Sequence, residues 1–140
     1  SLTGAGYRAY VDLLADKLPA AQRPRIAPSG LAFLMVHEER PYLWRKLFHC
    51  DHIHASPAGT LLQGLVVHHT LTGRLPPRDM IVRNDMEIWW KRARMMQHAW
   101  DPPNPFPTKA QAFYLYNVAA RIVLHRQVPK SYIDYQNVGL

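Results

Sequence analysis

The sequence has few of the features that mark several common classes of protein. Its 140 residues contain a single cysteine, Cys50, so no disulfide can form within the chain. No stretch approaches the roughly 18 consecutive apolar residues that a membrane-spanning helix requires. Lys and Arg form no run, and the formal charge of +7 is spread along the chain. These absences argue against a disulfide-stapled scaffold, a membrane span and direct nucleic-acid binding, and we expect a soluble protein.

What is present is typical of a globular protein. The apolar content of 48% and the charged content of 19% are ordinary values, and a chain of this length can bury a core. Prolines at 76–77 and in the cluster 102–107 divide the sequence. We predict two parts, residues 1–77 and a helical extension over residues 78–140 that packs on the first part.

The beginning of the chain predicts two helices and one strand. Apolar residues recur at helical spacing from Tyr7 to Leu18, which predicts a surface helix with one buried stripe. Residues 25–28 are a short candidate strand. Residues 31–36 are compatible with a strand or a helix, and we favour the helix.

Three further helices are expected after residue 55. Ser56 followed by Pro57 is typical of a helix start. Ser can accept a hydrogen bond from a backbone N–H of the first turn, and Pro at the first helical position has no N–H that would lack a partner. This helix should end near residues 72–73. A basic, aromatic helix is predicted around Trp89, and a last helix is predicted over residues 108–125.

The chemically richest stretch is the hexapeptide from His49 to His54. Within it, Asp51 and His54 form a D-x-x-H pair directly before a helix start. A carboxylate that accepts a hydrogen bond from one imidazole nitrogen fixes the tautomer, and the other nitrogen can then take a proton from a serine hydroxyl. Taken alone, this pattern is also compatible with a polar surface loop.

A zinc site is the rival interpretation of the same hexapeptide. Zinc needs three or four converging ligands, and residues one or two apart rarely converge without help from elsewhere. We therefore favour a catalytic loop without metal or cofactor. The potential ligands are His49, Cys50, Asp51, His52 and His54.

The surroundings of the pair resemble the C-terminal block of the SGNH hydrolases, the GDSL-like esterases and lipases. That family places its Asp and His three residues apart, immediately before the last core helix. Residues 51–60, Asp-His-Ile-His-Ala-Ser-Pro-Ala-Gly-Thr, are similar in letters and in context. Residues 26–33 look like the strand end and helix start that precede the block. The resemblance covers residues 5–77.

This resemblance implies a fold, a reaction and two roles. The implied fold class is α/β: the C-terminal part of a three-layer α/β/α SGNH-like sandwich, largely helical in this chain, with a helical C-terminal extension. The implied reaction is hydrolysis of a carboxylic ester substrate through an acyl-serine intermediate. Asp51 would be the orienting acid and His54 the general base.

The nucleophile of that family is missing from this pattern. The family's Gly-Asp-Ser block and oxyanion-hole residues precede the Asp-His block, and none is found before Asp51. Ser1 is followed by Leu-Thr-Gly, but only 49 residues separate it from Asp51, too few for the units that carry the oxyanion donors. We expect the nucleophilic Ser in an N-terminal portion of the same hydrolase, and we predict that residues 1–140 alone are inactive.

A function of another class is a non-catalytic helical binding module. The basic, aromatic helix around Trp89 would then bind a partner, in the manner of a calmodulin target or a membrane-surface helix. We favour packing of this helix on the core, because residues 108–125 offer a matching apolar face.

Overall fold

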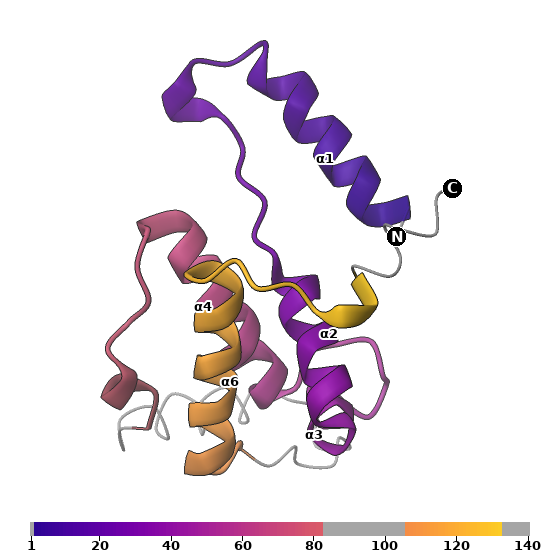
Figure 1. Cartoon of the computed structure of the whole chain (residues 1–140), viewed down its shortest axis with the longest axis vertical. Coiled ribbons are helices and arrows are strands. Elements are labelled where there is room, and N and C mark those ends of the chain that lie inside the picture. The colour runs from indigo at the N-terminus through magenta and orange to yellow at the C-terminus, as the bar shows by residue number, and fades with distance from the viewer. Residues whose placement is uncertain (1, 83–105, 133–140) are drawn as a thin grey trace.

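The computed structural model describes residues 2–82 and 106–132, and all structural statements below concern these residues. Helices α2, α3, α4 and α6 lie together, whereas α1 stands apart at the end of an extended linker (Figure 1). The elements are α1 (Leu2–Ala15), η1 (Ala20–Gln22), α2 (Ser29–Glu39), α3 (Pro41–Arg45), α4 (Pro57–Thr72), η2 (Arg78–Val82) and α6 (Lys109–Val123).

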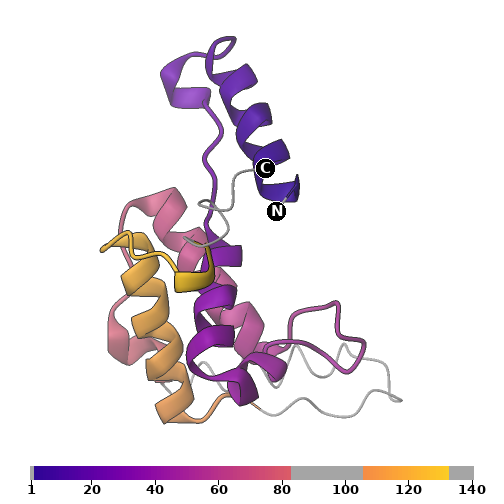
Figure 2. The same cartoon turned by 45° about the vertical axis from the view of Figure 1, so that its right-hand side comes forward.

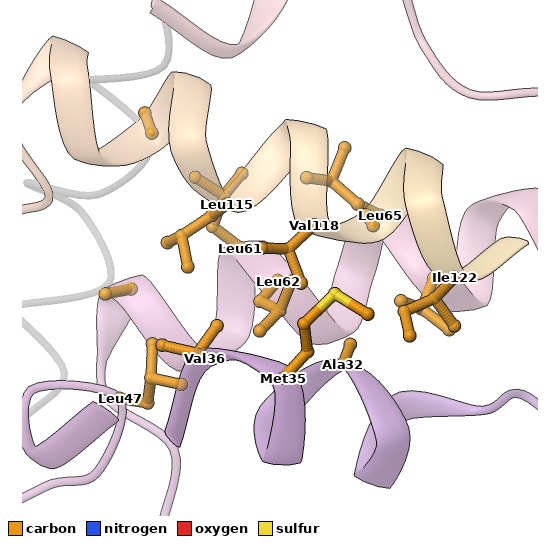
Figure 3. Close-up of a cluster of buried hydrophobic side chains, with 14 of the residues drawn as sticks. Ala32, Met35, Val36, Leu47, Leu61, Leu62, Leu65, Leu115, Val118 and Ile122 are labelled. Atoms are coloured by element: carbon orange, nitrogen blue, oxygen red, sulfur yellow. The ribbon is translucent and has the colours of Figure 1, made fainter. Parts of the chain in front are cut away.

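Helices α2, α4 and α6 meet in one hydrophobic core (Figure 3). On α2, Ala32, Met35 and Val36 have the i, i+3, i+4 spacing that places side chains on one helix face. Met35, Leu62 of α4 and Leu115 of α6 are fully buried. Full burial of an aliphatic side chain of this size contributes about 1.5–3 kcal/mol relative to exposure, so this core holds the three helices together.

The expected α/β/α sandwich is wrong. The described part of the chain contains helices but no strand or sheet, and its single β-bridge is the isolated antiparallel pair Phe48 and Ala55. Residues 25–28, expected as a strand, belong to an extended linker that leads into α2, and they pair with no strand in the part of the chain that the structure describes (Figure 1). Proline has no N–H to donate to a sheet, and an extended segment without a partner is not a strand.

The neighbouring segment, residues 31–36, forms a helix within α2, as favoured from the sequence. Its apolar residues bury one face against α4 and α6, which a short strand without a sheet could not achieve. Within the described residues no strand lies beside this segment, and its buried side chains pack against α4 and α6. The core of this chain is therefore a helix-on-helix core.

The first helix forms as predicted, but its predicted buried stripe is wrong. Tyr7, Tyr10 and Leu13 are each more than half exposed, and no described side chain of α1 is fully buried. The linker carries α1 away from the other helices (Figures 1 and 2), so its apolar side chains face no core. Helical spacing predicts a helix face, but it cannot supply the surface on which that face packs. A hydrogen bond of 2.7 Å from Arg8 to the Tyr132 hydroxyl joins α1 to the C-terminal segment.

Helix α4 has the predicted start and end. The Ser56 hydroxyl accepts a hydrogen bond from the N–H of Gly59, and Pro57 occupies the first turn. At the other end, Gly73 adopts a φ of 76°, the left-handed conformation that commonly closes a helix. The hydrogen-bonding and φ preferences of single residues therefore fix both ends of the helix that follows the candidate site.

The last helix also begins where the sequence predicts. The Thr108 hydroxyl accepts from the N–H of Gln111, whose side chain accepts from the N–H of Thr108. Helix α6 lies in the predicted extension, residues 78–140, and packs on α2 and α4 of the first part. The helix predicted around Trp89 falls outside the described residues. Of the helices that the structure describes, none has the length and apolar character needed to cross a membrane.

Candidate functional site

Residues 49–54, here called the site loop, join α3 to α4 and project away from the core helices (Figure 2). Backbone hydrogen bonds close the base of the loop. The N–H of His49 donates to the carbonyl oxygen of His54 at 2.7 Å, and the N–H of Ser56 donates to that of Leu47 at 2.9 Å. The loop therefore leaves and re-enters the fold at one point, and its conformation is tied to the start of α4.

Ser56 connects the two sides of this base. Its hydroxyl donates to the carbonyl oxygen of Lys46 at 2.5 Å and accepts from the N–H of Gly59 at 3.2 Å. The residue is only 3% exposed, so water cannot readily replace either partner. Ser56 thus caps α4 and also holds the end of α3 against it.

Asp51 and His54 contact each other as the sequence predicts. Oδ2 of Asp51 lies 2.5 Å from Nδ1 of His54, and Oδ1 accepts from the backbone N–H groups of Ile53 and His54 at 2.9 and 3.0 Å. Because an ionised carboxylate only accepts hydrogen bonds, Nδ1 carries the proton and Nε2 is the unprotonated nitrogen of the neutral ring. The His54 side chain is 81% exposed, which leaves Nε2 accessible to a reacting group.

Each member of the pair changes the pKa of the other. The hydrogen bond from His54, followed by the backbone N–H bonds, holds the pKa of Asp51 well below its usual value. The hydrogen bond and the charge attraction of Asp51 raise the pKa of His54 above 6.5. Asp51 is therefore ionised at neutral pH, and His54 becomes a stronger base than an ordinary histidine.

His52 lies on the same loop but outside the pair. Its φ of 59° is in the left-handed region, which His tolerates better than most residues, and its N–H donates to the carbonyl oxygen of His49 at 2.9 Å. His52 lines a pocket together with Trp44, Arg45 and Phe48. His52 and His54 therefore have different surroundings, although one residue separates them.

The described residues form no cluster of three or more His, Cys, Asp or Glu side chains that could hold a metal ion. Instead, four of the possible metal ligands in the site loop contact one another in two pairs. Cys50 Sγ lies 3.1 Å from Nδ1 of His49, and Asp51 faces His54. Two pairs of neighbours do not provide the three or four converging ligands of a zinc site.

None of the serines that the structure describes completes a triad. Ser56 is committed to the loop base, and the Ser131 hydroxyl donates to the Glu38 carboxylate. Ser29 is the first residue of α2, and no described hydroxyl is hydrogen-bonded to His54. Within the described residues, the Asp–His pair therefore has no nucleophile to activate.

A row of aromatic rings beside the loop was missed by the sequence analysis. Trp44 packs edge to face on Phe48 at a centroid distance of 5.3 Å. From α2, His37 packs on Trp44 at 4.7 Å and Phe33 packs on Phe48 at 5.7 Å. Phe33 and His37 are four residues apart, as are Trp44 and Phe48, and this spacing was a signal for two facing pairs.

Comparison of the chain with protein-family models, with curated proteins and with solved structures finds no match. The site and the sequence of residues 51–60 are therefore the features that point to a function.

Proposed function

We propose that this chain supplies the acid–base pair of a serine-type ester hydrolase, with His54 as general base and Asp51 as the carboxylate that orients it. The observation that carries the proposal is the 2.5 Å contact between Oδ2 of Asp51 and Nδ1 of His54. This contact fixes the tautomer in which Nε2 can accept a proton from a hydroxyl. The nucleophilic serine and the oxyanion donors would come from outside the described residues, in an N-terminal portion of the same hydrolase.

The reaction would proceed in two halves, with two proton transfers through His54 in each half. Nε2 takes the proton of the serine hydroxyl while the serine oxygen bonds to the ester carbonyl carbon, and the imidazolium then protonates the departing alcohol. In the second half, Nε2 takes a proton from water while the water oxygen bonds to the acyl carbon. The imidazolium then returns a proton to the departing serine oxygen, which releases the acid and restores the serine. Asp51 stays ionised throughout and stabilises the imidazolium that forms in each half.

The site loop supports this role because its geometry is fixed at the base. The backbone hydrogen bond from His49 to His54, together with the two hydrogen bonds of the Ser56 hydroxyl, restricts the loop where it meets the helices. A general base has to stay within hydrogen-bond reach of its hydroxyl, so a restrained loop favours catalysis over a loosely held surface turn.

A serine-reactive fluorophosphonate probe tests the proposal directly. The polypeptide that contains residues 1–140 is tagged and expressed, and the purified material is treated with the probe. We expect covalent labelling of a serine outside residues 1–140, lost in His54→Ala and kept in the matched control His52→Ala. Circular dichroism should show that both variants are folded.

Two results would contradict the proposal. One is the absence of labelling in the unaltered polypeptide, and the other is equal labelling of a folded His54→Ala variant. Residues 1–140 alone should not hydrolyse nitrophenyl acetate above a blank. Turnover by residues 1–140 that Ser1→Ala abolishes would place the nucleophile inside this chain and overturn the assignment of an external serine.

A further inference from the structure

An open pocket lies beside the site loop. Its lining consists of Trp44, Arg45, Phe48 and His52, and its volume is about 450 Å³, within the usual size of a small-molecule site. Trp44 and Arg45 come from the end of α3, whereas His52 comes from the site loop itself. The pocket and the Asp–His pair are therefore built on one segment of chain.

The aromatic walls of this pocket are held in place before any ligand binds. Trp44 and Phe48 are both half-buried and pack on each other. Behind them, His37 and Phe33 of α2 pack on the two rings. A ligand that enters such a site loses less binding free energy to ordering side chains than it would on a flexible surface.

One of the four lining residues, Arg45, carries a positive charge. Arg45 is exposed and has no ion pair within the described residues. The acidic side chains nearest to it along the chain before the loop, Glu38 and Glu39, are bonded to Ser131 and Arg121. The Arg45 guanidinium is therefore available to a carboxylate or ester oxygen at the mouth of the pocket.

We infer that this pocket binds the aromatic acyl group of the substrate, so that the hydrolase acts on esters of aromatic carboxylic acids. The inference rests on the proposed function. The aromatic ring would pack on Trp44 and Phe48, which favour another ring by offset or edge-to-face stacking. The carboxyl group would face Arg45 and His52, on the side of the site loop. A saturated acyl chain would gain no such stacking.

Binding can be measured without hydrolysis, with benzoate as the probe and residues 1–140 as the protein. Benzoate is titrated while the indole N–H resonances are followed by NMR, and a Trp44→Phe variant assigns the Trp44 signal. We expect a saturable shift of that signal. Cyclohexanecarboxylate has the same charge but no aromatic ring, and benzamide has the ring but no charge, so both should bind more weakly.

Three variants locate the site. Phe48→Leu and Arg45→Gln should each weaken benzoate binding by roughly 2- to 10-fold, as expected for the loss of one ring contact or one charged hydrogen bond. Tyr42→Ala is the matched control, because Tyr42 is an aromatic residue of α3 that is 83% exposed and lines a different pocket. The affinity of the Tyr42→Ala variant for benzoate should equal that of the unaltered protein.

The results separate this inference from the proposed function. No saturable shift of the Trp44 signal, or equal binding by Arg45→Gln and Tyr42→Ala, would overturn the pocket assignment. Arg45 is exposed, so its variant tests the site even where Phe48→Leu reduces stability. Neither result bears on the Asp51–His54 pair, which is decided by fluorophosphonate labelling of His54→Ala.

Discussion

The carbonyl oxygen of Leu47 lies 2.1 Å from the position that a Cβ on Gly59 would occupy. Real Cβ atoms do not approach an oxygen so closely, so the contact depends on glycine. The same oxygen accepts the N–H of Ser56 at 2.9 Å. The first turn of α4 therefore packs directly on the backbone that leads into the site loop.

This approach predicts opposite effects for two glycines of one helix. Gly59→Ala should lower the free energy of unfolding by roughly 1–3 kcal/mol, because the new methyl group meets backbone that cannot rotate away. Gly64→Ala, where a Cβ would meet nothing within 4 Å, should raise it by about 0.5–1 kcal/mol. Urea unfolding followed by circular dichroism measures both, and a stabilising Gly59→Ala would contradict the close packing.

The second prediction concerns the base of the site loop. Ser56→Ala and Thr108→Ala each remove an N-cap and should each cost about 1 kcal/mol of stability. Only Ser56 also bonds the Lys46 carbonyl before the loop. We therefore expect the pKa of His54, measured by NMR, to fall toward its ordinary value in Ser56→Ala and to stay unchanged in Thr108→Ala. Equal His54 titrations in the two variants would show that Ser56 acts on α4 alone.

The third prediction follows the titration of the pair. The pKa of His54 should lie above 6.5 and should move down toward that value in Asp51→Asn, because the acceptor of the Nδ1 proton loses its charge. Asp12→Asn removes the same charge on α1 and is the control. Histidine ring resonances recorded as a function of pH provide the measurement.

The direction in which pH changes the stability of the fold follows from the pKa shifts of His54 and Asp51. The raised pKa of His54 contributes stability that is fully present below pH 6.5 and is lost as the pH rises through the folded-state pKa. The lowered pKa of Asp51 contributes stability that is present above 3.8 and is lost at lower pH. The pair should therefore stabilise the fold most between these two values. A His54 titration that does not respond to Asp51→Asn would show that the pair does not form in solution.

The sequence predicted those features that depend on neighbouring residues. Ser56 and Thr108 start helices by accepting hydrogen bonds from N–H groups three residues away. Both partners of each bond therefore lie within one short stretch of sequence. The contact between Asp51 and His54 was predicted for the same reason, since a turn of three residues brings them together. The helix over residues 31–36 was favoured correctly, although a strand was also compatible.

The features that the sequence did not predict depend on distant partners. Residues 25–28 are extended, but only a paired neighbour would make them a strand. The apolar face of α1 forms at the predicted spacing and finds no surface to cover it. The ring contact of Trp44 with His37 and the ion pair of Glu39 with Arg121 join separate helices, the latter across 82 positions of sequence. The spacing within one segment can indicate that two side chains share a face, but it does not indicate which distant segment that face meets.

The fourth prediction concerns the connection of α2 to α6. Glu39 accepts two hydrogen bonds from Arg121, at 2.6 and 3.0 Å, and a third from the Tyr114 hydroxyl at 3.0 Å. A double-mutant cycle with Glu39→Gln and Arg121→Met should give a coupling of about 1 kcal/mol at pH 7, the upper end for partly exposed pairs.

The pH dependence of this coupling has a defined direction. The hydrogen bonds from Arg121 lower the pKa of Glu39, so the coupling should be present above pH 4.5 and lost as the pH falls through the folded-state pKa. Burial and the Glu39 contact raise the pKa of Tyr114, which the absorbance of tyrosinate can follow. A coupling that is independent of pH between 7 and 3 would show that the pair adds no charge-dependent stability.

The fifth prediction ranks three substitutions in the site loop by their effect on ester hydrolysis, measured as kcat/KM of the polypeptide that carries the nucleophile. His54→Ala removes the proton acceptor and should abolish turnover. Asp51→Asn should leave the fold intact but favour the wrong imidazole tautomer, and the loss of such a carboxylate can cost up to ~10⁴ in rate. His52→Ala should retain most of the activity on an acetate ester, because His52 is outside the pair and the small acyl group does not fill the aromatic pocket that His52 lines. The expected order of damage is His54 at least equal to Asp51, and both far greater than His52. An active His54→Ala enzyme, shown by circular dichroism to be folded, would rule out His54 as the general base, because the alanine side chain has no nitrogen that could accept the proton.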